Sequence, residues 1–72
     1  MKIIVPATPI KIFQRNEDSH YTSSMVAFMI VEDANSIGRY EINFVTISGT
    51  QISNHNIAFA KTLVDGAWRS HD

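Results

Sequence analysis

The sequence contains no cysteine, which excludes disulfide bonds, thiol catalysis and cysteine-ligated zinc sites. Charge is also scarce: 18% of the residues are charged and the formal net charge is −1. So weak an overall field is not typical of a protein that binds nucleic acid through a strongly basic surface. At 72 residues we expect one small domain, residues 1–72, which can bury only roughly 60% of its unfolded surface.

Long hydrophobic runs and glycine-rich motifs are missing as well. The apolar run in residues 1–5 is shorter than the roughly 7–15 residues of a secretory signal, and it ends at Pro6. Residues 42–60 carry no formal charge, but their asparagine and glutamine side chains are too costly in hydrocarbon for a membrane span. The glycines are isolated, so no phosphate loop or dinucleotide motif is present. We therefore expect a cytoplasmic protein with no membrane association and no cofactor.

Three segments have the pattern of β-strands. Residues 3–5 and 10–14 form a first strand interrupted by two prolines, which favours a sheet edge. Residues 21–31 form a second strand whose apolar run is typical of burial on both faces. The turn-forming residues 33–38 then lead into a third strand over residues 39–47, which begins with clear alternation of polar and apolar side chains.

The last third of the chain has the periodicity of an amphipathic helix. Ser53 is a suitable N-cap, and the helix is expected to end between Asp65 and Ser70, depending on whether Gly66 terminates it. The sequence thus predicts an α+β fold, an antiparallel three- to four-stranded meander with one C-terminal helix packed on one face (β-β-β-α). The apolar side of the helix would comprise Ile52, Ile57, Phe59, Ala60, Leu63, Val64, Ala67 and Trp68.

A single helix covers only one face of such a sheet, yet the strands carry apolar residues on both faces. An uncovered apolar face of several hundred Å² is typical of an interaction site. Three explanations are open. A second copy of the chain covers this face, or a different protein covers it. In the third, the N-terminal segment folds over the face, or the assignment of side chains to the two faces of the strands is wrong. The predicted interface residues are Phe13, Met25, Met29, Val31, Val45 and Ile47.

The histidines offer one candidate binding site. Ser53, His55 and Asn56 lie where the predicted helix begins, and free N–H groups at a helix N-terminus attract anions. The competing interpretation is ordinary helix capping. His20 lies beside Asp18 in a polar loop and is expected to be solvated. No metal-ligand spacing occurs, and no catalytic residues are expected, because the paired carboxylates lie in loops.

Nucleic acid is not an expected partner. The outward side chains of the third strand would be Arg39, Glu41 and Asn43, which do not form a basic surface. Tyr40 and Phe44 could stack on bases, but their phase directs them toward the predicted helix.

The sequence therefore predicts a small non-catalytic protein-interaction domain. It would form a homodimer or dock on a larger protein through an apolar sheet face or edge, as an inhibitor or accessory protein of the kind that phages and mobile elements encode. The alternative is an oligomeric subunit that binds a small anion at the N-terminus of the predicted helix.

Overall fold

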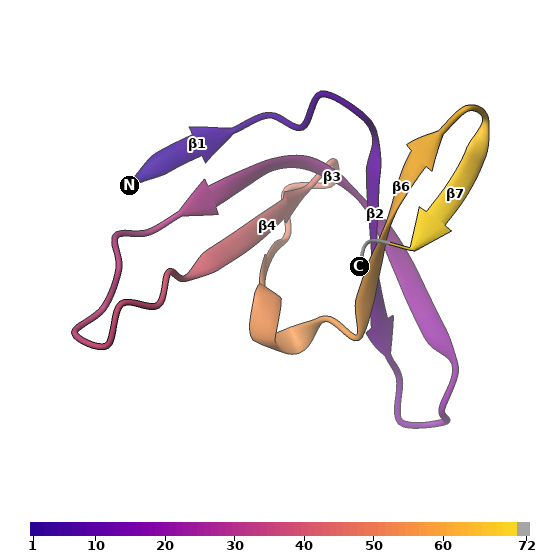
Figure 1. Cartoon of the computed structure of the whole chain (residues 1–72). Coiled ribbons are helices and arrows are strands. Elements are labelled where there is room, and N and C mark those ends of the chain that lie inside the picture. Colours follow the sequence, from indigo (N-terminus) through magenta and orange to yellow (C-terminus); the bar gives the residue numbers. More distant parts are fainter. Residues whose placement is uncertain (71–72) are drawn as a thin grey trace.

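The computed structural model describes residues 1–70, and these form an all-β fold (Figure 1). The strands pair antiparallel throughout. Within the described residues the only helical element is a single 3₁₀ turn, η1, at Asn54–Asn56. The strands are β1 (Lys2–Ile4), β2 (Ile10–Arg15), β3 (Tyr21–Val31), β4 (Ile42–Thr46), β5 (Gln51–Ser53), β6 (Phe59–Val64) and β7 (Ala67–Ser70).

The predicted C-terminal helix is wrong, and with it the α+β class and the three- to four-stranded meander. The segment instead forms the β6–β7 hairpin, in which Val64 pairs with Ala67. Asp65 and Gly66 make the two-residue turn with φ of 51° and 78°. Two central residues with positive φ are what a tight hairpin turn of type I′ requires, and Asp-Gly is its preferred dipeptide. The turn chemistry therefore outweighed the helical spacing.

The long strand β3 organises the sheet, whose strand order is β5-β4-β3-β2-β6-β7. One edge of β3 pairs first with β2 and then, near its end, with β1. The other edge pairs with β4. The break between β1 and β2 falls at Pro6 and Pro9, as predicted, but β2 is not an edge strand, because β6 pairs along its free side.

A bulge in β3, between Val26 and Phe28, divides the sheet into two halves. A β-bulge bends its strand and sharpens its twist, so one strand can contribute to both halves. The core lies on the inner face, between the halves; we call the opposite side the outer face. The buried apolar side chains are Ile12, Val26, Phe44 and Ile52, and Ile10, Met29, Ile42, Ile57 and Ala60 pack against them.

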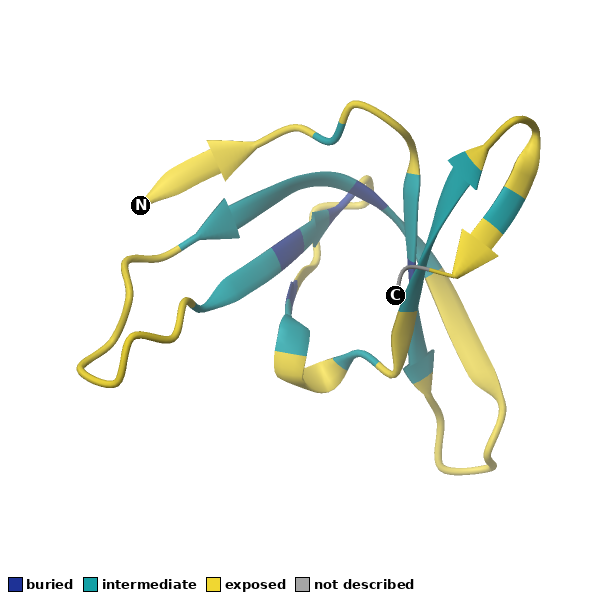
Figure 2. Ribbon diagram, in the orientation of Figure 1, coloured by how far each residue is buried: buried dark blue, intermediate teal, exposed yellow. Residues whose placement is uncertain are grey.

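This core is small for the chain that surrounds it, and Figure 2 shows that buried residues form only short segments of the ribbon. The chain exposes 5222 Å², whereas a compact monomer of 8.1 kDa exposes about 4500 Å². Its radius of gyration is 12.8 Å, against about 11 Å for a compact domain of this length. The fold thus leaves some ~700 Å² more surface in water than a self-contained domain of this mass.

Candidate functional site

An apolar strip runs along the outer face of β1, β3 and β4. Ile3 pairs with Ile30, and Phe28 pairs with Val45. Directly paired residues point their side chains to the same side of a sheet, so both pairs lie on the face opposite the core. Ile47, two residues beyond Val45, continues the strip and is 74% exposed. We call these five residues, Ile3, Phe28, Ile30, Val45 and Ile47, the outer strip.

The six predicted interface residues do not share one surface. Val45 and Ile47 lie in the outer strip. Phe13 and Met25 lie on the outer face of the other half of the sheet, where Met25 pairs with Lys11. Met29 and Val31 point to the inner face instead, because Met29 pairs with the buried Phe44 and Val31 pairs with Ile42.

The bulge explains this division. Alternation along residues 21–31 places Met25 and Met29 on the same side, but one irregular position between them reverses the phase of the strand. For the same reason Phe28 and Ile30, which alternation assigns to the covered face together with Val26, lie outside. No pattern in the sequence indicates a bulge at this position, so Phe28 and Ile30 were not predicted to belong to the interface.

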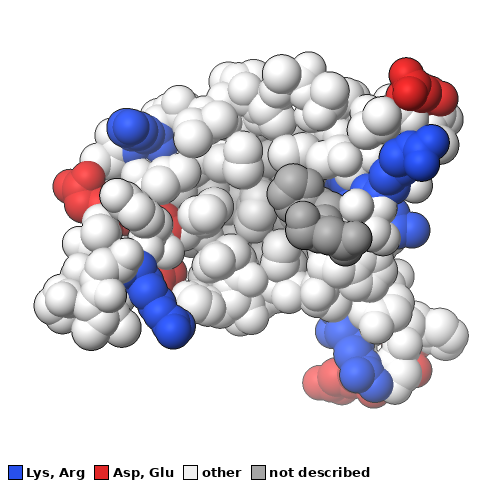
Figure 3. Space-filling view, viewed as in Figure 1, with Lys and Arg blue, Asp and Glu red and all other residues white. Residues whose placement is uncertain are grey.

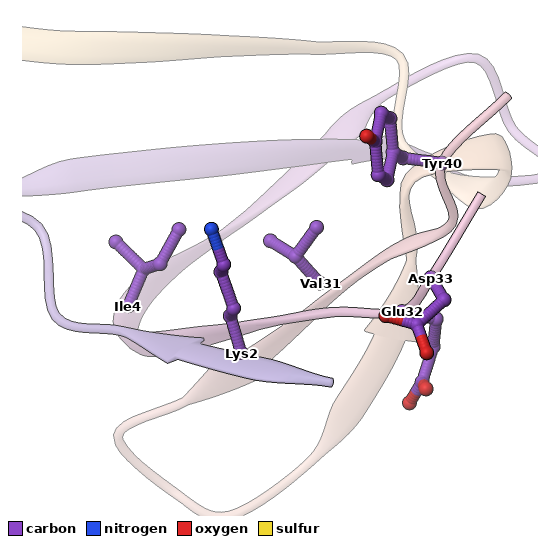
Figure 4. Close-up of a pocket in the computed structure, with 6 residues that line it drawn as sticks. All are labelled: Lys2, Ile4, Val31, Glu32, Asp33 and Tyr40. Atoms are coloured by element: carbon purple, nitrogen blue, oxygen red, sulfur yellow. The ribbon is translucent and has the colours of Figure 1, made fainter. Parts of the chain in front are cut away.

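The inner face is hollowed at two places, each with a volume of about 360 Å³. The first hollow opens between the two halves of the sheet and is almost entirely apolar. The second lies between β1 and the start of the β3–β4 loop, and there Lys2, Ile4 and Val31 project to the same side of the ribbon (Figure 4). The first is lined by Ile10, Met29, Ile42, Phe44, Ala60 and Thr62, and the second by Lys2, Ile4, Val31, Glu32, Asp33 and Tyr40.

Of the residues predicted to bind an anion, Ser53 ends β5 and caps the 3₁₀ turn, and His55 and Asn56 lie in that turn, without the helix that the prediction required. Ser53 Oγ accepts a hydrogen bond of 3.3 Å from the backbone N–H of His55. The imidazole Nε2 of His55 lies 3.2 Å from Glu41 Oε1. A carboxylate already beside the imidazole repels a second anion, and a turn of three residues has no helix dipole to offset that repulsion.

An acid–imidazole pair occupies the tip of the β2–β3 loop. His20 Nδ1 lies 3.1 Å from Asp18 Oδ2, and the backbone N–H of His20 donates to Asp18 Oδ1 at 3.1 Å. These two contacts, the side-chain bond first, hold the pKa of Asp18 below its ordinary value. Both side chains are exposed, and within residues 1–70 neither is in a salt bridge with any other residue, so the pair is a local loop contact.

Because the pKa of Asp18 is lowered, its contact with His20 stabilises the folded loop at pH values above the ordinary aspartate pKa. Its contribution is lost as the pH falls through the lowered value. We expect His20→Ala to raise the pKa of Asp18 toward its ordinary value and to leave the free energy of unfolding near pH 7 almost unchanged, because the pair is solvent-screened. An NMR titration of the Asp18 carboxyl carbon measures this. Identical titration curves for the parent and the variant would contradict it.

Comparisons with protein-family models, with curated proteins and with solved structures found no match for this chain. Within residues 1–70, no three histidine or carboxylate side chains gather where they could hold a metal ion. The same part of the chain contains no helix with the length and apolarity needed to cross a membrane.

Proposed function

We propose that this chain is a small non-catalytic protein-interaction domain that forms a homodimer through its outer strip. The observation that carries the proposal is the excess of exposed surface over that of a compact monomer, some ~700 Å². A standard protein interface buries about 800 Å² on each partner, so the excess has the size of one side of an interface.

The outer strip is the part of that surface best suited to self-association. Four of its large apolar side chains come from three adjacent strands and the fifth, Ile47, from the turn after β4; none is charged. Ile3 and Ile47 are exposed, and the other three are half-buried. In a two-fold dimer the same patch occurs on both partners, so a patch without charge meets no like-charge repulsion. Figure 3 shows one face of the molecule, on which the charged side chains lie mainly toward the periphery. Burial of apolar area contributes roughly 25 cal/mol per Å² to association.

The proposal is tested by charging one end of the outer strip. Ile47→Glu places a carboxylate in the proposed interface, where burying it without a partner costs enough to weaken dimerisation by about tenfold or more. Ile37→Glu is the matched control, since Ile37 is also 74% exposed but lies in the β3–β4 turn, outside the strip. Sedimentation velocity of both variants measures the dissociation constant.

We expect Ile47→Glu to shift the sample to monomer at concentrations where the parent and Ile37→Glu remain dimeric. Circular dichroism should show the same β-sheet signal in all three proteins, because both positions are exposed. Equal weakening by the two substitutions would show that general surface charge, rather than the outer strip, governs association, and the proposal would fail.

A further inference from the structure

The outer face of the other half of the sheet carries aromatic and basic side chains in alternation. Phe13 pairs with Phe59 and Lys11 pairs with Lys61, so all four point to the same side. Tyr21 and Trp68 join this face from the strands on either side, β3 and β7. We call these six residues, Lys11, Phe13, Tyr21, Phe59, Lys61 and Trp68, the aromatic–basic face.

The aromatic rings are already in contact in this structure. Phe13 and Phe59 stack with ring centroids 4.6 Å apart and an interplanar angle of 17°. Tyr21 packs edge-on against Phe59 with centroids 5.1 Å apart, and its side chain is half exposed. Rings held by their neighbours lose little conformational entropy when a planar ligand stacks on them.

The charges on this face have one sign. Arg15 lies on the same side of β2 as Lys11, so the face and its border hold three cations, and the paired strand positions of that side include no carboxylate. Within residues 1–70 none of the three cations is in an ion pair. A chain with a net charge of −1 therefore carries a local basic surface that its overall charge conceals.

The pairing of Lys11 with Lys61 is the feature that points to an anion. Like charges directly opposite one another on adjacent strands destabilise a sheet. Each ammonium group lies over an aromatic ring, Lys11 Nζ at 4.3 Å from the Trp68 centroid and Lys61 Nζ at 5.8 Å from that of Phe13. These contacts place the cations among the rings and leave them without an opposite charge. The phosphates of a bound strand, each with one negative charge, would neutralise both.

We propose that the aromatic–basic face binds single-stranded nucleic acid. Bases would stack on the exposed rings of Tyr21 and Phe59, and the phosphates between them would contact Lys11 and Lys61. This combination of a basic track with stacking rings is how single strands are bound without sequence readout. The inference departs from the expectation drawn from the sequence, which weighed the overall charge together with Tyr40 and Phe44, and it is independent of the outer strip.

The chain contains one tryptophan, Trp68, so the proposed face carries its own fluorescent probe. The experiment titrates the protein with a twelve-base oligothymidylate and, in a second arm, oligouridylate, following Trp68 fluorescence and the anisotropy of a labelled strand. We expect quenching and binding in both arms. The affinity should fall with salt at a log–log slope of about −2, because three neutralised phosphates each contribute about −0.7. A difference between the arms would show whether the face senses the ribose 2′-hydroxyl.

Matched variants separate stacking from charge. Tyr21→Ala should weaken binding by about tenfold, whereas Tyr21→Phe, which keeps the ring, should bind like the parent. Lys61→Glu should weaken binding strongly, whereas Lys2→Glu, which changes the charge equally but lies outside the face, should weaken it far less. Circular dichroism of each variant establishes that it is folded.

Three results would overturn the inference. One is the absence of Trp68 quenching by either strand at low salt. Another is equal weakening by Lys61→Glu and Lys2→Glu, which would mean that binding follows net charge alone. The third is quenching by poly-glutamate at the same concentration as the oligonucleotide, which would identify an acidic polypeptide as the partner of this face.

Discussion

Ile12→Ala is expected to remove a large part of the free energy of unfolding. Ile12 is the one large side chain of the described residues that is completely buried, and its strand β2 lies between β3 and β6. Truncating a buried isoleucine to alanine costs about 2–5 kcal/mol through lost burial and the cavity that remains. A domain of this length has a free energy of unfolding on the order of 5 kcal/mol, so the loss is a large fraction of the total.

Urea denaturation followed by far-ultraviolet circular dichroism measures this loss. Ile37→Ala is the control, because Ile37 is 74% exposed and its truncation should change the free energy of unfolding by no more than about 0.5 kcal/mol. If Ile12→Ala and Ile37→Ala had similar urea midpoints, Ile12 would not lie at the centre of the core. The packing described for the two halves of the sheet would then be contradicted.

Phe44→Ala should be of similar severity, at about 3–5 kcal/mol. Phe44 is 9% exposed and pairs with Met29 on one side and Ile52 on the other, so it joins three strands across the inner face. It also forms part of the wall of the apolar hollow. Removing its ring would enlarge that hollow.

Thermal melts of Phe44→Ala and Phe44→Leu test this argument. Leucine restores most of the buried volume, so the leucine variant should recover more than half of the lost stability. Because the hollow is open, its walls can relax, and a loss for Phe44→Ala below about 1 kcal/mol would show that the two halves do not pack against each other through this ring.

The sequence predicted the first half of the fold better than the second. The apolar run and its polar borders located β3 at residues 21–31, and the turn residues located the connection to β4. In residues 52–68 the apolar side chains fit a helical period, and residues 59–64 show no alternation of polar and apolar side chains that would indicate a strand. The signal for the hairpin is the dipeptide Asp65-Gly66, which forms its turn.

The surfaces could be predicted only in part, since they depend on which strands become neighbours. A second apolar face was expected, and Val45 and Ile47 do lie on the outer face. Met29 was predicted on this face, but the bulge in β3 turns it to the inner face and places Phe28 and Ile30 on the outer face. Alternation in the sequence does not reveal such a bulge. The aromatic–basic face could not be inferred, because Phe13 and Phe59 are distant in the chain and meet only when β6 returns to β2.

The molar mass in solution is the most direct test of homodimerisation. Light scattering coupled to size-exclusion chromatography, from about 1 µM to about 1 mM protein, reports the assembly without any label. We expect twice the chain mass of 8.1 kDa at the upper concentrations, with dissociation on dilution. A mass of one chain across the whole range would contradict it, because the excess exposed surface would then not serve self-association.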